Sequence, residues 1–149
     1  MRDLFPLFPV AAITLFFATG PFVMASPTGS LAPVQFVFTG FKMQAGQMMA
    51  QLTCAEKPGD KGRLIPALAD VRGPQVVIRF PDQRVGQVCT MRAFRDENGN
   101  QKLDMGPFGI PKEPFAFSNN AVATLGPPKP EAIRFVVQSG QNSQTILIK

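Results

Sequence analysis

The stretch VQFVFTGF, residues 34–41, alternates between two sets of side chains. Val34, Phe36 and Phe38 fall on one face of an extended chain, because successive side chains of a strand point to opposite sides. A second stretch, QMMAQLTC at residues 47–54, repeats the pattern with its even-numbered residues apolar. The two stretches therefore predict two β-strands, each with one face in a core.

The rest of the chain extends this all-β pattern. Its 15 prolines and 13 glycines leave little room for a long helix, and the best places for a helical turn or two are residues 64–70 and 115–121. Several short strands between regular turn signals predict a sandwich or a barrel. Further strands are expected at residues 75–80, 88–95, 132–138 and 145–149.

Residues 1–25 have the features of a secretory signal peptide. The run from Val10 to Gly20 is uncharged and apolar, and Val23 and Ala25 stand at the two positions that a signal peptidase reads. We expect cleavage before Ser26, export to the periplasm or the extracellular space, and no transmembrane anchor after processing; an uncleaved anchor is the alternative. Residues 26–149 then form one domain.

The composition excludes several kinds of chemistry. The chain has no His, which rules out Ser-His-Asp and Cys-His arrangements and every zinc or haem site that uses His. Its net charge of +5 comes from scattered bases, which favours an ordinary solvated surface over attraction to anionic envelope polymers or lipid head groups. With no Trp, no Tyr and no basic helix, nucleic acid is not an expected partner.

Cys54 and Cys89 are the two cysteines of the chain. Each lies in an expected strand and shares the parity of its apolar neighbours, and an even count in an oxidising compartment favours a disulfide between them. The alternative is two buried thiols that act as small apolar side chains. A redox enzyme is not expected, because the chain has no Cys-x-x-Cys motif.

Residues 96–104, DENGNQKLD, have the oxygen spacing of a calcium loop. Positions 1, 3, 5 and 9 carry carboxylates or amides, and position 7 offers a main-chain carbonyl; position 6 is not Gly and position 12 is not Glu, so the EF-hand pattern is incomplete. The alternative is a plain polar turn around Asn-Gly. The expected calcium ligands are Asp96, Asn98, Asn100, Lys102 and Asp104.

The region from Ala93 to Phe135 contains five short motifs that belong together. They are Asp96-Glu97-Asn98-x-Asn100, Lys102-Leu103-Asp104, Gly109-Ile110-Pro111-x-Glu113, Phe117-Ser118-Asn119-Asn120 and Gly126-Pro127-Pro128. With these motifs the region resembles a bacterial family known as domain of unknown function 2141. Arg95 stands where a His is usual in that family, and Gln101 where a Gly is usual. The resemblance implies an exported envelope protein with a transthyretin-like β-sandwich, and it implies no activity.

The segment GIPKEPFAFSNN, residues 109–120, offers several polar side chains. Glu113, Ser118, Asn119 and Asn120 either add oxygens over the 96–104 loop, line a groove for a sugar or peptide, or satisfy the backbone of their own loop; the last is the favoured interpretation.

The leading functional interpretation is a non-enzymatic envelope module with a binding or structural role, whose partner is an envelope protein or a polysaccharide. One alternative is a glycan hydrolase that uses paired carboxylates from Asp96, Glu97, Asp104 and Glu113. Another is an adaptor that pairs through an exposed sheet edge.

Overall fold

The computed structural model describes residues 29–124 and 126–148, and these residues form a two-sheet β-sandwich, which confirms the expected fold class. One sheet has the order β4-β1-β8, and the other has the order β3-β2-β5-β6 with β7 also paired to β5. The strands are β1 Leu31–Thr39, β2 Gln47–Ala55, β3 Arg63–Asp70, β4 Gln75–Arg84, β5 Val88–Asp96, β6 Phe115–Phe117, β7 Arg134–Val136 and β8 Asn142–Leu147. The helical elements are the 3₁₀ turns η1 Pro107–Gly109 and η2 Ser118–Asn120, and the single turn α1 Pro130–Ile133. The expected signal peptide lies outside the described residues.

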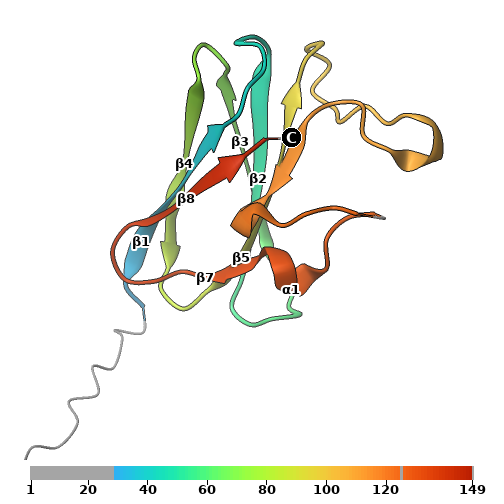
Figure 1. The fold of residues 1–149 in the computed structure, drawn as a ribbon. Helices are drawn as coiled ribbons and strands as arrows, with labels where there is room; N and C mark the ends of the chain where they lie inside the picture. Colours follow the sequence, from blue (N-terminus) through green and yellow to red (C-terminus); the bar gives the residue numbers. More distant parts are fainter. Residues whose placement is uncertain (1–28, 125, 149) are drawn as a thin grey trace, which may run out of the picture.

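All neighbouring strands are antiparallel except β1 and β8, which run parallel. Strands β1 and β8, which are far apart in the sequence, thus lie side by side (Figure 1). The three-stranded sheet is complete only when β8 pairs with β1.

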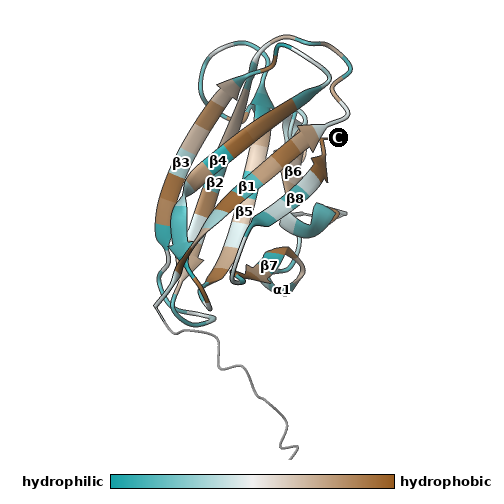
Figure 2. Cartoon of the chain, turned by 90° about the vertical axis from the view of Figure 1, so that its left-hand side faces the viewer, coloured by the Kyte–Doolittle hydropathy of each residue, from teal (hydrophilic) through white to brown (hydrophobic). Residues whose placement is uncertain are grey.

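The core lies between the two sheets and is built by the alternation read from the sequence. Phe36 and Phe38 of β1 are fully buried, as are Met48 and Leu52 of β2. Figure 2 shows the corresponding alternation of apolar and polar bands along β1. The Phe36 ring meets the rings of Phe80, Phe135 and Phe38 at centroid distances of 6.0, 5.8 and 6.3 Å, so phenylalanines supply the bulk of a core that has no Trp or Tyr.

Of the two segments expected to be helical, one is a strand and the other is part strand and part helical turn. Residues 64–70 belong to β3, which pairs along its whole length with β2, because that pairing places Ile65, Ala67 and Ala69 toward the core. Residues 115–121 begin as strand β6 and continue as the single 3₁₀ turn η2. Conversely, the strand expected at 132–138 starts with the helical turn α1, where Pro130 occupies a position at which its missing N–H costs nothing.

Candidate functional site

The 96–104 loop is organised by one buried carboxylate. Asp96 ends β5 and is fully buried. Its Oδ1 accepts the N–H of Gly99 at 2.7 Å, and its Oδ2 accepts the N–H of Gln101 at 2.7 Å. Gln101 has a φ of 60°, the left-handed conformation that Gly adopts without cost. Gln101 therefore adopts the left-handed turn conformation that the Gly usual at this position would adopt.

The other polar side chains of the loop bind one another. The Oδ1 atoms of Asn98 and Asn100 accept the N–H groups of Asn100 and Lys102 at 3.0 and 2.8 Å. The Nδ2 of Asn98 donates to Asp104 Oδ2 at 2.6 Å, and the Nδ2 of Asn100 donates to both oxygens of Asp104 at 3.0 and 3.1 Å. The structure thus brings three of the predicted ligands together, Asn98, Asn100 and Asp104, but with two amide NH₂ groups facing the Asp104 carboxylate. The carboxylate of Asp96, the fourth predicted side-chain ligand, binds the backbone of the loop instead.

Glu113 supplies a second buried carboxylate to the same loop. It is 6% exposed, and its Oε1 and Oε2 accept the N–H groups of Glu97 and Asp104 at 2.9 and 3.1 Å. The N–H of Lys112 donates to the Asp104 carbonyl at 2.8 Å. Side-chain and backbone hydrogen bonds therefore both join the segment around Glu113 to the 96–104 loop. Among the polar residues of segment 109–120 that could add oxygens over the loop, Glu113 binds the loop directly.

Arg95 fixes the loop to the segment before β2. Its side chain is 4% exposed, its Nε donates to the Ala45 carbonyl at 2.9 Å, and one guanidinium nitrogen lies 3.2 Å from Glu97. Gly46 follows with a φ of 85°, and a Cβ there would lie 2.4 Å from the Asp96 carbonyl oxygen. This close approach requires Gly and holds the 40–46 segment against the end of β5.

These contacts bear on the calcium expectation. Within residues 29–124 and 126–148, no group of three or more Asp, Glu, Cys or His side chains is placed to hold a metal ion. Calcium would require the amides of Asn98 and Asn100 to turn so that their oxygens face Asp104, and both would then give up a bond to a backbone N–H. The donor set therefore fits calcium only after rearrangement, and calcium binding stays a prediction.

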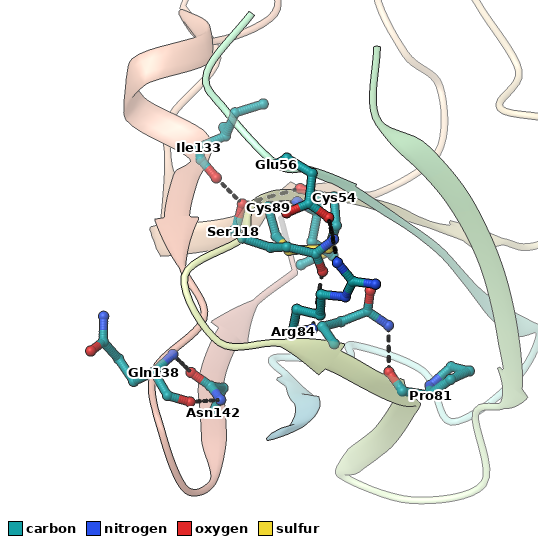
Figure 3. The surroundings of a disulfide bond; sticks show 12 residues. Cys54, Glu56, Pro81, Arg84, Cys89, Ser118, Ile133, Gln138 and Asn142 are labelled. Carbon is teal, nitrogen blue, oxygen red and sulfur yellow. Dashed lines mark hydrogen bonds and ion pairs between the residues drawn. A yellow bond between two sulfur atoms is a disulfide. The ribbon is translucent and has the colours of Figure 1, made fainter. Parts of the chain in front are cut away.

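Ser118, Asn119 and Asn120 brace the sandwich at a distance from this loop. The Ser118 hydroxyl is fully buried, accepts the N–H of Met91 at 3.0 Å and donates to the Ile133 carbonyl (Figure 3). The Nδ2 of Asn119 donates to two carbonyls on either side of Ile133. Asn120 donates to the Thr145 carbonyl and accepts the N–H of Leu147, both at 2.8 Å, and so covers the free edge of β8.

The predicted cysteine pairing is present. Cys54 and Cys89 are directly opposite each other in the β2–β5 register, with Cα atoms 4.1 Å apart, and form a disulfide (Figure 3). The two residues are 3% and 0% exposed. The bond therefore joins the central strands of the larger sheet from the core side.

An apolar row crosses the outer face of the larger sheet, and the sequence analysis missed it. The register places Leu68 opposite Met49, Met49 opposite Phe94, and Phe94 opposite Phe115. Phe117 adds a second ring on the outer side of β6, packed edge-on against Phe115 at 5.8 Å. Met49 and Phe94 have the parity opposite to the core residues of their strands, and this parity could have predicted that they lie on the outer face. Their alignment into one row depends on the strand registers, which the sequence does not give.

The outer face of the smaller sheet is different. Its three central register lines are Arg79–Gln35–Ser143, Val77–Val37–Thr145 and Gln75–Thr39–Leu147. Two of the three lines are mainly polar, and no line places more than two large apolar side chains next to each other. The two outer faces of the sandwich are thus chemically unequal.

Two of the four carboxylates considered for a hydrolytic pair, Asp96 and Glu113, are engaged by the backbone. Asp96 and Glu113 each have both oxygens bonded to backbone N–H groups. On Asp70, the amide of Gln47, helped by a hydrogen bond and the charge of Arg72, holds the pKa of the carboxyl below its ordinary value. A general acid needs a raised pKa, so this shift is in the wrong direction for acid catalysis.

The fold and these sites define a disulfide-linked β-sandwich with a carboxylate-organised loop and one apolar outer face. Over residues 37–145, the chain matches the model of a family described as an uncharacterized protein conserved in bacteria, DUF2141. The chain belongs to this family, which confirms the resemblance found in its sequence motifs. Comparison with curated proteins and with solved structures gives no match.

Proposed function

We propose that this chain is an exported, non-catalytic binding module of the bacterial cell envelope, and that it binds a partner protein with the outer face of the β3-β2-β5-β6 sheet. The observation that carries the proposal is the row Leu68–Met49–Phe94–Phe115 on that face. Leu68 is 55% exposed, and a contiguous apolar patch rimmed by polar groups is typical of an interaction surface.

Export is supported by the disulfide and by the expected signal peptide. Disulfides persist in oxidising compartments and are rare in the cytosol. The bond between Cys54 and Cys89 therefore fits a protein that works outside the cytoplasm. Among the described residues, no helix has the length and apolar character needed to cross a membrane.

A protein fits this face better than a polysaccharide. Sugars are recognised by many hydrogen bonds to hydroxyl groups, whereas the row consists of Leu, Met and Phe side chains, which offer no hydroxyl, amide or charged group. Arg92 and Gln51, which flank the row, supply the polar rim that protein interfaces have.

Docking on the face is favoured over strand addition at an edge. Pro66 lies in the edge strand β3 and carries no N–H, so a further strand would lack a donor at that point. The free edge of β8 is occupied by the side chain of Asn120. Both devices are ways in which natural sheets block edge-to-edge pairing.

A matched pair of substitutions tests this proposal by mild crosslinking in the native envelope. Leu68→Asp should remove the crosslinked partner band, whereas Leu147→Asp, on the other sheet and 48% exposed, should keep it. Both leucines are half exposed, so neither change empties a core site. An unchanged band in the Leu68→Asp variant would refute the assignment of the face.

Weak, structural calcium binding by the 96–104 loop is a separate proposal. It is supported by the convergence of Asn98, Asn100 and Asp104, and it requires the amides to turn. With a dissociation constant of about 10⁻³ M, about 5 mM calcium should raise the free energy of unfolding by about 1 kcal/mol. A thermal melt should then shift upward by a few degrees relative to chelator, and Asp104→Ala should lose the shift while Glu97→Ala keeps it. Equal melts in calcium and chelator would leave a plain turn.

A further inference from the structure

A second register line crosses the outer face of the larger sheet beside the apolar row. It runs from Pro66 through Gln51 and Arg92 to Phe117. Arg92 is exposed and projects from the inner strand β5, and Phe94 lies two residues further along the same face of that strand. A single cationic side chain thus stands between the rings of the apolar row and the Phe at the end of its own line.

The two register lines enclose an open depression of about 490 Å³. Arg92 is the one charged residue among those that line it. Sites of this size accept one or more anchoring side chains of a partner, and a few polar groups in an apolar lining fix what is accepted. The large apolar side chains of the lining are Met49, Leu68 and Phe94, and its long polar ones are Gln51, Arg92 and Gln101.

The guanidinium of Arg92 has no opposite charge in contact. None of the ion pairs within residues 29–124 and 126–148 includes it. The two acidic residues in the strands of this sheet, Asp70 and Asp96, lie four register positions away, about 13 Å along the strand direction. That distance exceeds the screening length of about 8 Å at physiological ionic strength. The neighbouring Arg134 is already paired with Glu131 at 3.0 Å.

The charges of segment 95–113 give this face a direction. The segment begins beyond Phe94, at the opposite end of the depression from Arg92, and Gln101 belongs to it. It carries one net negative charge, which disfavours a carboxylate of a partner at that end. Its acidic residues are Asp96, Glu97, Asp104 and Glu113, and its bases are Arg95, Lys102 and Lys112.

A second copy of the chain does not supply the missing carboxylate from the same face. Asp96 is fully buried, and Asp70 is already paired with Arg72. A symmetric interface uses the same patch on both copies, so it would bring two Arg92 side chains together with no free acidic residue from these strands between them. The charge of this face therefore points to a different protein as its occupant.

We propose that the partner presents an Asp or Glu side chain set among large apolar side chains, that its carboxylate pairs with Arg92, and that its apolar neighbours cover the Leu68–Met49–Phe94–Phe115 row. A guanidinium binds a carboxylate through two parallel hydrogen bonds, and Arg is enriched among the residues that dominate interfaces. This inference rests on the proposed protein-binding face and adds the chemistry of the partner.

Charge variants of the exported chain test the inference by the same mild crosslinking in the native envelope. Arg92→Glu should lower the yield of the crosslinked partner band at least tenfold, because a repulsion replaces the attraction. The matched control is Arg79→Glu, which makes the same change in net charge and should keep the yield. Arg79 is exposed on the outer face of the smaller sheet, and it also takes no part in the ion pairs of the described residues. Both variants should keep the melting temperature, since both side chains are exposed.

A zero-length crosslink detects the acidic group directly. A carbodiimide joins an amine to a carboxylate and does not join a guanidinium. Arg92→Lys should therefore gain a link from position 92 to an Asp or Glu of the partner, identified by mass spectrometry of the linked peptides. Arg79→Lys should gain no such link.

The outcomes separate this inference from the proposed function. If Leu68→Asp removes the partner band and Arg92→Glu keeps it, the face stands and the acidic partner is wrong. A band kept in both variants would overturn the face and the inference together. Absence of a link from position 92 in Arg92→Lys, with the partner band still present, would also overturn the inference. A link to a carboxylate of a second copy would replace it by self-association.

Discussion

Replacing both Cys54 and Cys89 by Ala should lower the free energy of unfolding by about 3–4 kcal/mol. The disulfide closes a loop with a sequence separation of 35 residues, and most of its effect comes from the entropy that this closure removes from the unfolded chain. Such a loss is a large part of the stability of a small domain. Urea unfolding of the oxidised unchanged protein and of the double variant measures it.

The control for this prediction is reduction of the unchanged protein. Its unfolding midpoint should move close to that of the double variant when a reductant is present, and the variant itself should not respond to the reductant. Both cysteines are buried, so the reductant must be added under conditions where the protein opens. A difference below about 1 kcal/mol between the oxidised unchanged protein and the double variant would contradict the prediction, because the bond would then add little to the native pairing of β2 with β5.

The same two strands show how far local sequence patterns determine this fold. Phe36, Phe38, Met48 and Leu52 were assigned to the core from their alternation, and each is fully buried. The cysteine pairing followed from parity and compartment alone, but the direct opposition of Cys54 and Cys89 depends on the β2–β5 register, which the sequence does not encode locally.

Strand β3 shows where local reasoning fails. Its sequence, RLIPALAD, contains good helix formers and a Pro in the middle, so propensity favours a turn of helix. Pairing with β2 overrides this preference, and Pro66 is tolerated because β3 is an edge strand. Tertiary pairing is a long-range property, and residues 63–70 alone do not contain it.

The candidate sites likewise combine features that the sequence predicted with features that it did not. The spacing in DENGNQKLD identified a structured polar loop and named the side chains that converge in it. It did not determine where each oxygen points, because Asp and Asn side chains in short turns bind nearby backbone N–H groups as readily as a cation. The apolar row needed three strand registers at once, so it was not visible beforehand.

Asp96→Ala should destabilise the protein by about 3 kcal/mol or more, since hydrogen bonds to a charged acceptor contribute about 1.5–3 kcal/mol each and this carboxylate accepts two. Both acceptor oxygens lie 2.7 Å from backbone nitrogens, those of Gly99 and Gln101, and the side chain is fully buried. Alanine would leave these two donors without a partner and would release Gln101 from its left-handed conformation. Urea unfolding in the presence of a chelator measures the loss without any contribution from calcium.

Asn98→Ala is the matched control, because Asn98 is an exposed side chain of the same loop. It should cost under about 1 kcal/mol, in the range of an ordinary exposed hydrogen bond. Glu113→Ala should resemble Asp96→Ala, because that carboxylate also accepts two backbone N–H groups. A loss in Asp96→Ala no greater than in Asn98→Ala would show that the loop does not depend on its buried carboxylate. A large loss that appears only when calcium is present would instead assign Asp96 to the cation.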